Sequence, residues 1–381
     1  MKILVNTIAT KKHAGGVFQI SNNYILKTLE HLEIDWFYIT SEDVDEAVGE
    51  SFASIRGTKY FVFPTQPDYL HTLSKVRREI HNLENRIKPD LIYSVAAQSF
   101  IKFKTVEVTR LTNPWVTHPN KYAWSTLAIK EKVIYYLHSL VRKRTIKKHK
   151  YFITQSETCA KGIRNIVGVP DKNVKVVSNV LPAVFNTMDN TPVIEDAFIN
   201  VACVGNSTPH KNFDIIPDVI KELVSTGYTN IRFHTTLPET SAVWSVVQQK
   251  LEKYNLIGYV VNHGRISQTE LGQMYQRCQL CFLPTLLEVF SASTVEAMFF
   301  QLPIVATDFE FNTEVLADSC LYYKPKNAKD AALQLKKIIS DKSLQEDLKG
   351  KMKKRLTIYG DYDSHFNSIE DFLVNVVKGN I

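Results

Sequence analysis

Residues 287–303, LEVFSASTVEAMFFQLP, follow a short apolar run, LCFLP, that predicts a buried parallel strand. From Ser293 to Phe300 the stretch itself predicts a helix, with Glu296 inside it and Glu288 in the turn before it. Hydroxyl side chains near the helix start are suited to capping its first turn: Ser291, Ser293 and Thr294. The free N–H groups of that turn and the helix dipole favour an anion such as a diphosphate. A strand end, a capped helix and two acids can hold one nucleotide sugar.

The chain on both sides of this stretch alternates between strand-like apolar runs and amphipathic helical patterns. Strands separated by helices of this length imply parallel sheets that are covered on both faces. The periodicity lapses over residues 181–196, which we interpret as a linker, and then starts again. We therefore predict an α/β protein with two doubly wound, Rossmann-like domains, 1–185 and 186–361. Ligands of such sheets bind outside the carboxyl ends of the strands, so we expect the site in a cleft between the domains.

Length and composition favour an ordinary globular protein of two domains. The 381 residues are too many for one usual core, and 44% are hydrophobic and 22% charged. No run approaches the roughly 18 apolar residues of a membrane span, and the short apolar start reads as a first strand rather than a signal peptide. Five cysteines without a framework spacing favour a reducing, cytoplasmic location. The pair Cys278 and Cys281 reads as small core residues rather than a metal or redox site.

Glu288 and Glu296 stand at the E-x7-E spacing of the family-four retaining glycosyltransferases, and the flanking PTLLEVFSASTVEAM and QLPIVATD resemble that family's motif and following strand. The resemblance implies the GT-B fold, with a C-terminal helix, about 362–381, crossing back onto the first domain. It also implies that Glu288 meets hydroxyls of the donor sugar and Glu296 the nucleotide ribose. Amides near Phe290, Ser291 and Ala292 would meet the sugar or diphosphate. Val289 and Ser291 replace glycines of the common pattern, so donor geometry is expected to differ.

The predicted second domain opens with VACVGNSTPHKNF, a strand, Gly205, a loop and Lys211 before a helix. An ammonium there can neutralise a departing diphosphate, which is a large electrostatic demand of glycosyl transfer. In the family this segment carries Gly-Arg and then a lysine five residues after the arginine. Here Lys211 keeps its place, but Asn206 occupies the arginine position. This departure removes one cation, and His210 is a candidate to replace part of the charge.

Two further positions resemble the family's site. His118, at the end of the segment PWVTHP that we predict as a strand, resembles the cleft histidine that contacts the transferring sugar. Gly15 and Gly16 follow the first strand and resemble the glycine loop that approaches the donor phosphates or the acceptor. A structural histidine and a plain turn are the alternatives.

Positive charge is concentrated in the first half, where residues 1–190 hold 27 Lys+Arg against 17 Asp+Glu and the remainder holds 19 against 22. The run VRKRTIKKHK, residues 141–150, ends a predicted helix that starts near Leu127. A peripheral contact with an anionic membrane would use its cations: Arg142, Lys143, Arg144, Lys147, Lys148 and Lys150. The alternative is a solvated face at the cationic helix end, where the dipole favours positive charge. We expect no nucleic-acid partner, because the run lacks aromatics on a recognisable module.

The resemblance favours a retaining glycosyltransferase that moves a sugar from a nucleoside diphosphate sugar to a glycan or lipid-linked glycan, in surface polysaccharide biosynthesis. We expect no metal and no cofactor, because the two D-x-D matches, at Asp43 and Asp361, fall in an acidic run and a terminal segment. A noncatalytic nucleotide-sugar-binding scaffold is the alternative, supported by Asn206. A nicotinamide-dependent oxidoreductase lacks its glycine fingerprint.

Overall fold

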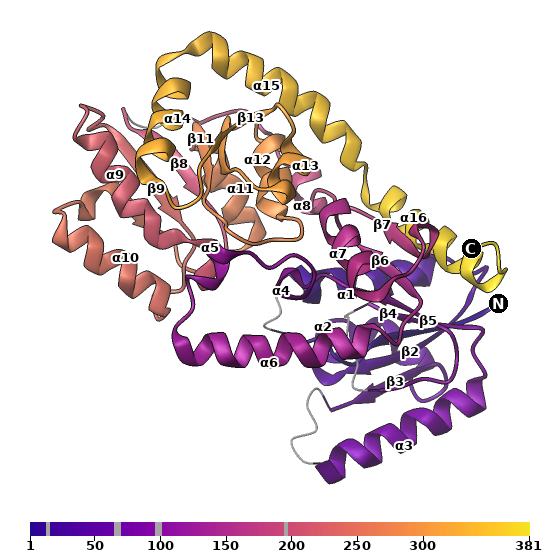
Figure 1. The fold of residues 1–381 in the computed structure, drawn as a ribbon. Coiled ribbons are helices and arrows are strands. Elements are labelled where there is room, and N and C mark those ends of the chain that lie inside the picture. Colours follow the sequence, from indigo (N-terminus) through magenta and orange to yellow (C-terminus); the bar gives the residue numbers. More distant parts are fainter. Residues whose placement is uncertain (13–15, 65–69, 96–100, 194–196) are drawn as a thin grey trace. The chain divides into compact units, whose positions relative to one another are not determined.

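The computed structural model describes residues 1–12, 16–64, 70–95, 101–193 and 197–381 (Figure 1). Contacts divide the chain into two compact units, each built from separate segments. The first unit comprises Met1–Thr117, Leu137–Val177 and Asp363–Ile381, and the second comprises His118–Tyr136 and Ser178–Tyr362. The domain boundaries at residues 185 and 361 stay a prediction, because these units are defined by contacts and not by independent folding.

The first unit is built on a seven-stranded parallel sheet in the order β3-β2-β1-β4-β5-β6-β7. Its strands are β1 (Lys2–Thr7), β2 (Asp35–Ser41), β3 (Tyr60–Phe63), β4 (Leu91–Ser94), β5 (Glu107–Arg110), β6 (Tyr151–Thr154) and β7 (Val174–Val176). Its helices are α1 (Gly16–Lys27), α2 (Glu42–Val48), α3 (Leu70–Ile87), α4 (Pro114–Thr117), α7 (Glu157–Val167) and α16 (Tyr362–Val377). The order reverses between β1 and β4, as in a doubly wound fold.

Alternating side chains of β1 feed two cores on opposite faces of this sheet, as a pleated strand requires. Ile3 and Val5 pack in a cluster that includes residues of α1 and α16, whereas Leu4 packs in a cluster that includes α3. The C-terminal helix α16 thus covers the first sheet, with the Phe366 ring centroid 5.0 Å from that of Tyr24. The burial of both sheet faces explains why the strands read as continuous apolar runs.

The second unit repeats this arrangement with a six-stranded parallel sheet in the order β10-β9-β8-β11-β12-β13. Its strands are β8 (Ile199–Cys203), β9 (Ile231–Thr235), β10 (Val260–Asn262), β11 (Leu280–Leu283), β12 (Ile304–Thr307) and β13 (Cys320–Tyr323). Its helices are α5 (Lys121–Trp124), α8 (Ala183–Asn186), α9 (Ile216–Val224), α10 (Ala242–Lys253), α11 (Gln268–Gln276), α12 (Ala292–Phe299), α13 (Glu310–Leu316), α14 (Ala328–Ser340) and α15 (Lys342–Leu356). The helix α6 (Ile129–Ile146) begins in the second unit and ends in the first.

Alternation along β8 again separates two cores. Val201 and Cys203 pack with residues of α9, α10 and α14, and Ala202 packs with residues of α11, α12 and α15. The prediction of two doubly wound parallel sheets is therefore confirmed. Within the residues described here, no helix is both long enough and apolar enough to span a bilayer.

One predicted strand is wrong in a way that affects the site. The segment PWVTHP contains the short helix α4 and not a strand. Pro114 is its first residue, where a fixed φ favours the helix and the missing N–H costs nothing. His118 therefore follows a helix end.

Candidate functional site

The predicted donor residues of the second unit come from loops after β8 and β11, which are neighbours in the sheet. The loop after β8 carries Gly205 and Lys211, and the loop after β11 carries Glu288. The strand order reverses between these two strands. Ligands of doubly wound sheets bind at this reversal, outside the carboxyl ends of the strands.

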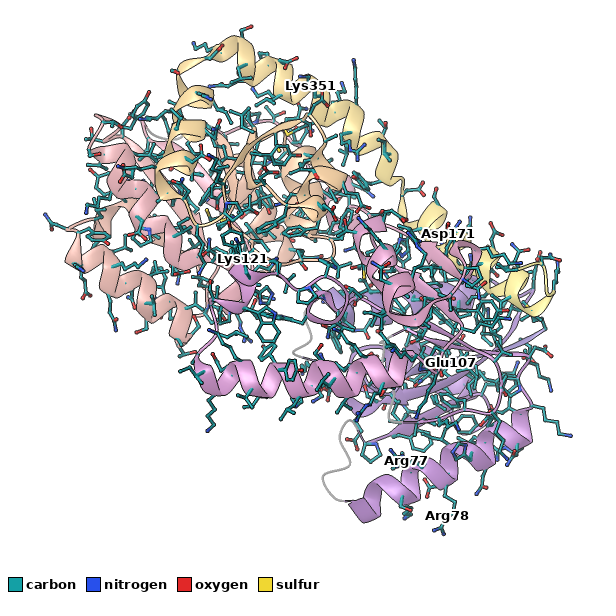
Figure 2. All side chains as sticks on the ribbon, viewed as in Figure 1. Arg77, Arg78, Glu107, Lys121, Asp171 and Lys351 are labelled. Carbon is teal, nitrogen blue, oxygen red and sulfur yellow. The ribbon has the colours of Figure 1, made fainter. Side chains whose placement is uncertain are left out.

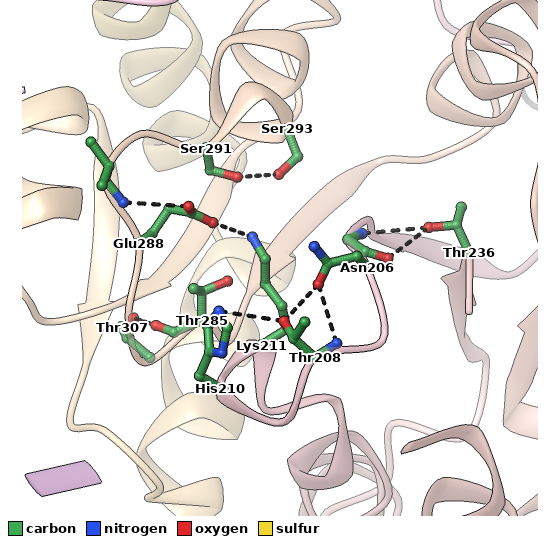
Figure 3. Close-up of polar contacts among 12 residues, drawn as sticks. Asn206, Thr208, His210, Lys211, Thr236, Thr285, Glu288, Ser291, Ser293 and Thr307 are labelled. Carbon is green, nitrogen blue, oxygen red and sulfur yellow. Dashed lines mark hydrogen bonds and ion pairs between the residues drawn. The ribbon is translucent and has the colours of Figure 1, made fainter. Parts of the chain in front are cut away.

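Lys211 and Glu288 form an ion pair between Nζ and Oε2 (Figure 3). Lys211 is the last residue of a short 3-10 helix, Pro209–Lys211, and only 8% of it is exposed. The Glu288 side chain is 21% exposed, and its other oxygen accepts from the Val289 N–H at 3.3 Å. A buried ammonium has lost most of its hydration, so a nearby carboxylate compensates its charge. The structure thus brings together two residues that the sequence assigned to the donor site independently.

His118 contacts the backbone of Glu288 and belongs to the same unit. Its Nε2 lies 2.7 Å from the Glu288 carbonyl oxygen. A carbonyl only accepts, so the ring carries a hydrogen on Nε2 and donates it. Burial lowers the pKa of His118, which favours the neutral ring, although nearby carboxylates oppose the shift. His118 therefore holds the main chain at the residue whose carboxylate meets Lys211.

Asn120, which the sequence analysis did not assign to the site, anchors the same loop. Its Oδ1 caps α5 by accepting from the N–H groups of Tyr122 and Ala123, both at 3.0 Å. Its Nδ2 donates to the Leu286 carbonyl at 2.7 Å. An asparagine before a helical pattern is a recognisable cap signal, but the bond to a residue 166 positions away has no local signal.

The main chain of His210 also holds Leu286, because the Leu286 N–H donates to the His210 carbonyl at 2.8 Å. Burial, together with the charge of Lys211, lowers the pKa of His210 to about 4. The ring is therefore neutral at pH 7. The expectation that His210 replaces part of the missing arginine charge is not supported by this pKa.

Glu296 lies on α12 and is buried, with 6% of its surface exposed. The hydroxyl of Tyr275, from α11, donates to its Oε2 at 2.9 Å, and the Tyr275 ring stacks on Phe300 with centroids 5.3 Å apart. Burial raises the pKa of Glu296 to about 7, while Tyr275 and the charge of Lys211 oppose the shift. Glu296 is thus a fixed carboxyl group that changes protonation near neutral pH. Tyr275 was missed because it lies 21 positions away on another helix.

The start of α12 carries the remaining motif residues. Ser291 occupies the N-cap position, Ala292 begins the helix, and Phe290 is buried with its ring 5.4 Å from that of Tyr359. The Ser291 hydroxyl does not cap the helix as predicted; it lies 2.7 Å from the Ser293 hydroxyl (Figure 3). The Thr294 N–H meets the Ser291 carbonyl at 3.2 Å instead.

Gly205 and Asn206 form the turn after β8. A Cβ at Gly205 would lie 3.1 Å from the Phe213 ring, so the glycine permits close packing of this loop. The Asn206 Oδ1 accepts from the N–H and the hydroxyl of Thr208, at 3.2 and 2.6 Å. Asn206 therefore shapes the loop that carries Lys211 but supplies no positive charge (Figure 3).

The predicted glycine loop belongs to the first unit. Gly16 is exposed and begins α1, with no atom within 4 Å of a Cβ built there. Gly15 lies outside the described residues. Gly16 therefore leaves open space at the start of this helix.

The first D-x-D match is part of α2, where Asp45 pairs with Arg56 at 2.5 Å and the Asp43 Oδ2 accepts from the Lys12 N–H at 2.7 Å. Among the residues that the structure describes, no group of three or more His, Cys, Asp and Glu side chains could share a metal ion. Cys278 and Cys281 are buried free thiols.

One segment of the second unit matches a known protein family. Residues 187–355 match the family model described as "Glycosyl transferases group 1". The O-antigen chain mannosyltransferase RfbU of Salmonella typhimurium is 23% identical over 354 residues, which are 88% of this chain and 90% of the relative. The matched segment contains Lys211, Glu288 and Glu296.

Solved structures show the fold. Anabaena Alr3699/HepE, in complex with UDP-glucose, has a TM-score of 0.72 at 14% identity, covering 98% of this chain and 100% of that one. The sucrose-phosphate synthase of Thermosynechococcus elongatus has a TM-score of 0.70 at 13% identity, covering 100% of both chains. The lipopolysaccharide outer core galactosyltransferase WaaB, in its apo form, has a TM-score of 0.66 at 14% identity, covering 98% and 99%. The two doubly wound units and these solved structures show that the chain has the GT-B fold, and the group 1 match over residues 187–355 agrees with its resemblance to the family-four glycosyltransferases.

Proposed function

We propose that this enzyme transfers a sugar from a nucleoside diphosphate sugar, with retention at the anomeric carbon, to a glycan or lipid-linked glycan of a surface polysaccharide. The observation that carries the proposal is the ion pair between buried Lys211 and partly exposed Glu288, beside the start of the motif helix α12. The ion pair joins Lys211, whose charge suits a diphosphate, to Glu288, whose carboxylate suits sugar hydroxyls. The Salmonella relative, an O-antigen chain mannosyltransferase, supports the polysaccharide context.

Lys211 would bind the diphosphate in this proposal. Its ammonium is held in a largely buried position, where an electrostatic interaction is stronger than in bulk water. As the bond between sugar and phosphate breaks, negative charge grows on the leaving diphosphate, and a prepositioned cation stabilises that charge. Asn206 supplies none, so Lys211 would bear more of this demand than in relatives with an arginine there.

Glu288 and Glu296 would orient the donor. The Glu288 carboxylate can accept hydrogen bonds from sugar hydroxyls, and His118 would stand beside the sugar while holding the Glu288 backbone in place. Glu296, fixed by Tyr275, can accept from the hydroxyls of the nucleotide ribose. The amides at Phe290, Ser291 and Ala292, and the glycines Gly15, Gly16 and Gly205, would allow close approach of the backbone to phosphate or sugar.

The proposed chemistry is a same-face displacement. The anomeric C–O bond to the β-phosphate breaks, the acceptor oxygen bonds to that carbon on the same face, and its proton passes to the leaving phosphate oxygen. Because Lys211 neutralises the leaving group, we propose that no metal is needed. Activity is therefore expected to survive removal of divalent cations by EDTA.

The first test is thermal unfolding with UDP, GDP, ADP and TDP and their sugars, with and without magnesium. Saturation at about 100 times the dissociation constant adds roughly 2.7 kcal/mol to the stability. A metal-independent rise in Tm with one nucleotide, abolished in Glu296→Ala, supports the donor assignment. A rise with NAD alone would contradict it.

The second test uses the donor so identified with a membrane acceptor fraction, and reads the anomeric configuration of the product by NMR. A retained anomer supports the proposal, and an inverted anomer refutes the mechanism. Donor binding without transfer to any acceptor would instead favour the noncatalytic scaffold, for which Asn206 is the supporting observation. The acceptor, if lipid-linked, would be reached from the cytoplasmic face of the cell membrane.

A further inference from the structure

The helix α6 exposes an unusual amount of apolar surface. Seven of its large apolar side chains are exposed: Ile129, Val133, Ile134, Tyr136, Leu137, Leu140 and Val141. The exposed fraction reaches 82% at Ile129 and 62% at Val141. Single exposed apolar residues are ordinary, but a contiguous group on one helix marks an interaction surface.

These residues follow helical spacing. Ile129, Val133, Tyr136 and Leu140 recur every three or four positions, so they form one stripe along the helix, which we call the α6 stripe. Ile134, Leu137 and Val141 extend it on one side. The buried residues of α6, Ser139 and Ile146, lie on the opposite face. Only a narrow face of the helix is therefore buried in the protein, and its apolar face is exposed to solvent.

Cations accompany the α6 stripe and continue beyond it. Residues 129–150 contain eight Lys and Arg against one carboxylate, Glu131. Arg144 is exposed and falls at the spacing that extends the stripe toward the end of the helix, and Lys147, directly after the helix, is exposed too. A solvated cationic helix end accounts for the charges, but it does not account for the apolar stripe that precedes them.

The C-terminal half of α6 also lines a cavity of about 840 Å³ in the first unit. Its lining contains six Lys and Arg residues: Arg77, Lys102, Lys104, Arg142, Lys148 and Lys150. Among the described lining residues the one carboxylate is Glu107, which pairs with His149 at 3.3 Å and accepts from the Ser94 hydroxyl at 2.5 Å. Figure 2 shows Arg77 on α3 and Glu107 on β5. We call this the cationic cavity.

We propose that α6 docks on an anionic bilayer, with the α6 stripe inserted among the lipid chains and the cationic cavity holding lipid phosphates. Val141 belongs to both features, so the apolar and cationic surfaces adjoin on one helix. Charge complementarity selects an anionic lipid, because each Lys or Arg near such a surface favours binding and the stripe supplies the apolar area.

The inference deepens the proposed function, because it identifies the surface through which the enzyme would reach a lipid-linked acceptor. It is nevertheless tested apart from that function. Vesicle binding is measured without donor or acceptor, so its failure leaves sugar transfer unaffected, and failure of sugar transfer leaves vesicle binding unaffected.

Co-sedimentation of the full chain with vesicles provides the first test. Vesicles of phosphatidylcholine with 30% phosphatidylglycerol should bind the protein at least tenfold more tightly than phosphatidylcholine alone. Equal binding to both would overturn the proposal. Inorganic tripolyphosphate provides a soluble phosphate probe. If the protein binds tripolyphosphate but does not bind vesicles, the proposal that the cationic cavity holds lipid phosphates is wrong.

Matched variants separate the two surfaces. Val133→Gln/Leu137→Gln/Leu140→Gln changes the α6 stripe, and Lys102→Ser/Lys104→Ser/Lys148→Ser changes the cationic cavity. Each should weaken binding to anionic vesicles at least tenfold. The controls replace exposed residues elsewhere, Val246→Gln/Ile257→Gln/Leu333→Gln and Lys329→Ser/Lys342→Ser/Lys354→Ser, and should leave binding unchanged. A stripe or cavity variant that binds like its control would contradict the proposal.

Site-specific fluorescence tests insertion directly. All five cysteines are buried, so a thiol placed by Val133→Cys can be labelled selectively with an environment-sensitive maleimide. Its emission should increase and shift to the blue on anionic vesicles, whereas a label at Ile257→Cys should not respond. A silent label at position 133 with intact vesicle binding would show that the stripe does not insert and would overturn that part of the mechanism.

Discussion

Lys211 and Glu288 are 77 positions apart in the chain, yet their side chains form an ion pair at the carboxyl ends of neighbouring strands. The pair fixes a lysine that is only 8% exposed. A diphosphate that binds Lys211 would face the Glu288 carboxylate, so the two anions compete for one ammonium. Glu288 then becomes available to sugar hydroxyls as the diphosphate arrives, which makes donor binding an exchange of partners.

Glu288→Gln should separate binding of the nucleotide from transfer of the sugar. The amide cannot compete for Lys211 as a carboxylate does, so the Kd for the nucleoside diphosphate should stay equal or fall. Transfer should fall at least about 100-fold, because donor orientation is lost. Calorimetry with the nucleotide and a product assay check the two effects. Glu252→Gln, at an exposed position on α10, is the control. A parallel loss of nucleotide affinity and transfer would contradict the exchange.

Glu296 should make stability depend on pH near neutrality. Its pKa is raised by burial to about 7, so the folded protein holds a proton that the unfolded chain releases near pH 4.5. The contribution of Glu296 to the free energy of unfolding should therefore fall as pH rises from about 4.5 to about 7, by up to roughly 3 kcal/mol. Glu296→Gln cannot ionise and should flatten this dependence. Urea unfolding at several pH values measures it.

Tyr275→Phe provides the matched comparison for Glu296. The Tyr275 hydroxyl favours the ionised carboxylate, so its removal should raise the pKa of Glu296 further. The pH range of decreasing stability should then extend to higher pH. An unchanged pH profile in both variants would show that Glu296 does not titrate in this range.

His210 should act in the opposite direction over an overlapping pH range, so the contributions of Glu296 and His210 partly cancel in the wild type and are separated by their variants. Burial and the Lys211 charge lower its pKa to about 4. As pH falls, the unfolded chain therefore binds a proton near pH 6.5, whereas the folded protein binds it only near pH 4. The stability that neutral His210 contributes should therefore be fully present above pH 6.5 and should decrease as pH falls toward 4, by up to roughly 3 kcal/mol. His210→Gln should reduce this slope, whatever its stability at pH 7. A slope equal to that of the wild type in acid unfolding experiments would exclude His210 as the cause.

The sequence was sufficient to predict both sheets and the residues of the motif, because these depend on local patterns. Buried parallel strands read as short apolar runs, and the spacing of Glu288 and Glu296 is a property of one segment. The resemblance to a glycosyltransferase family was likewise visible in the motif and its flanks. The strand β5, EVTR, was missed because charged and polar residues interrupt its apolar pattern, whereas β13, CLYY, was missed although it is apolar like the strands that were predicted.

The contacts that organise the site could not be predicted, because they join distant segments. Nothing near His118 indicates that its ring meets the Glu288 backbone, 170 positions away. The same holds for Tyr275 and Glu296, and for Asn120, whose local capping role gives no hint of its second bond. The orientation of α6 also lacked a clear signal, since an apolar stripe normally marks the face that packs inward.

Substitution by alanine should change the stability differently at three helical glycines, because the atoms that the new Cβ would meet differ in how far they can move. A Cβ at Gly162 on α7 would lie 2.4 Å from the Thr117 carbonyl oxygen, whereas one at Gly272 on α11 would meet the flexible end of Met188 at 2.5 Å. At Gly350 on α15 no atom lies within 4 Å. Gly350→Ala should gain about 1 kcal/mol from helix propensity, and Gly272→Ala should change stability little. Gly162→Ala should lose about 1–3 kcal/mol, because a backbone atom must move. Thermal unfolding of the three variants gives their order, and a stabilised Gly162→Ala would refute the close approach of α7 to α4.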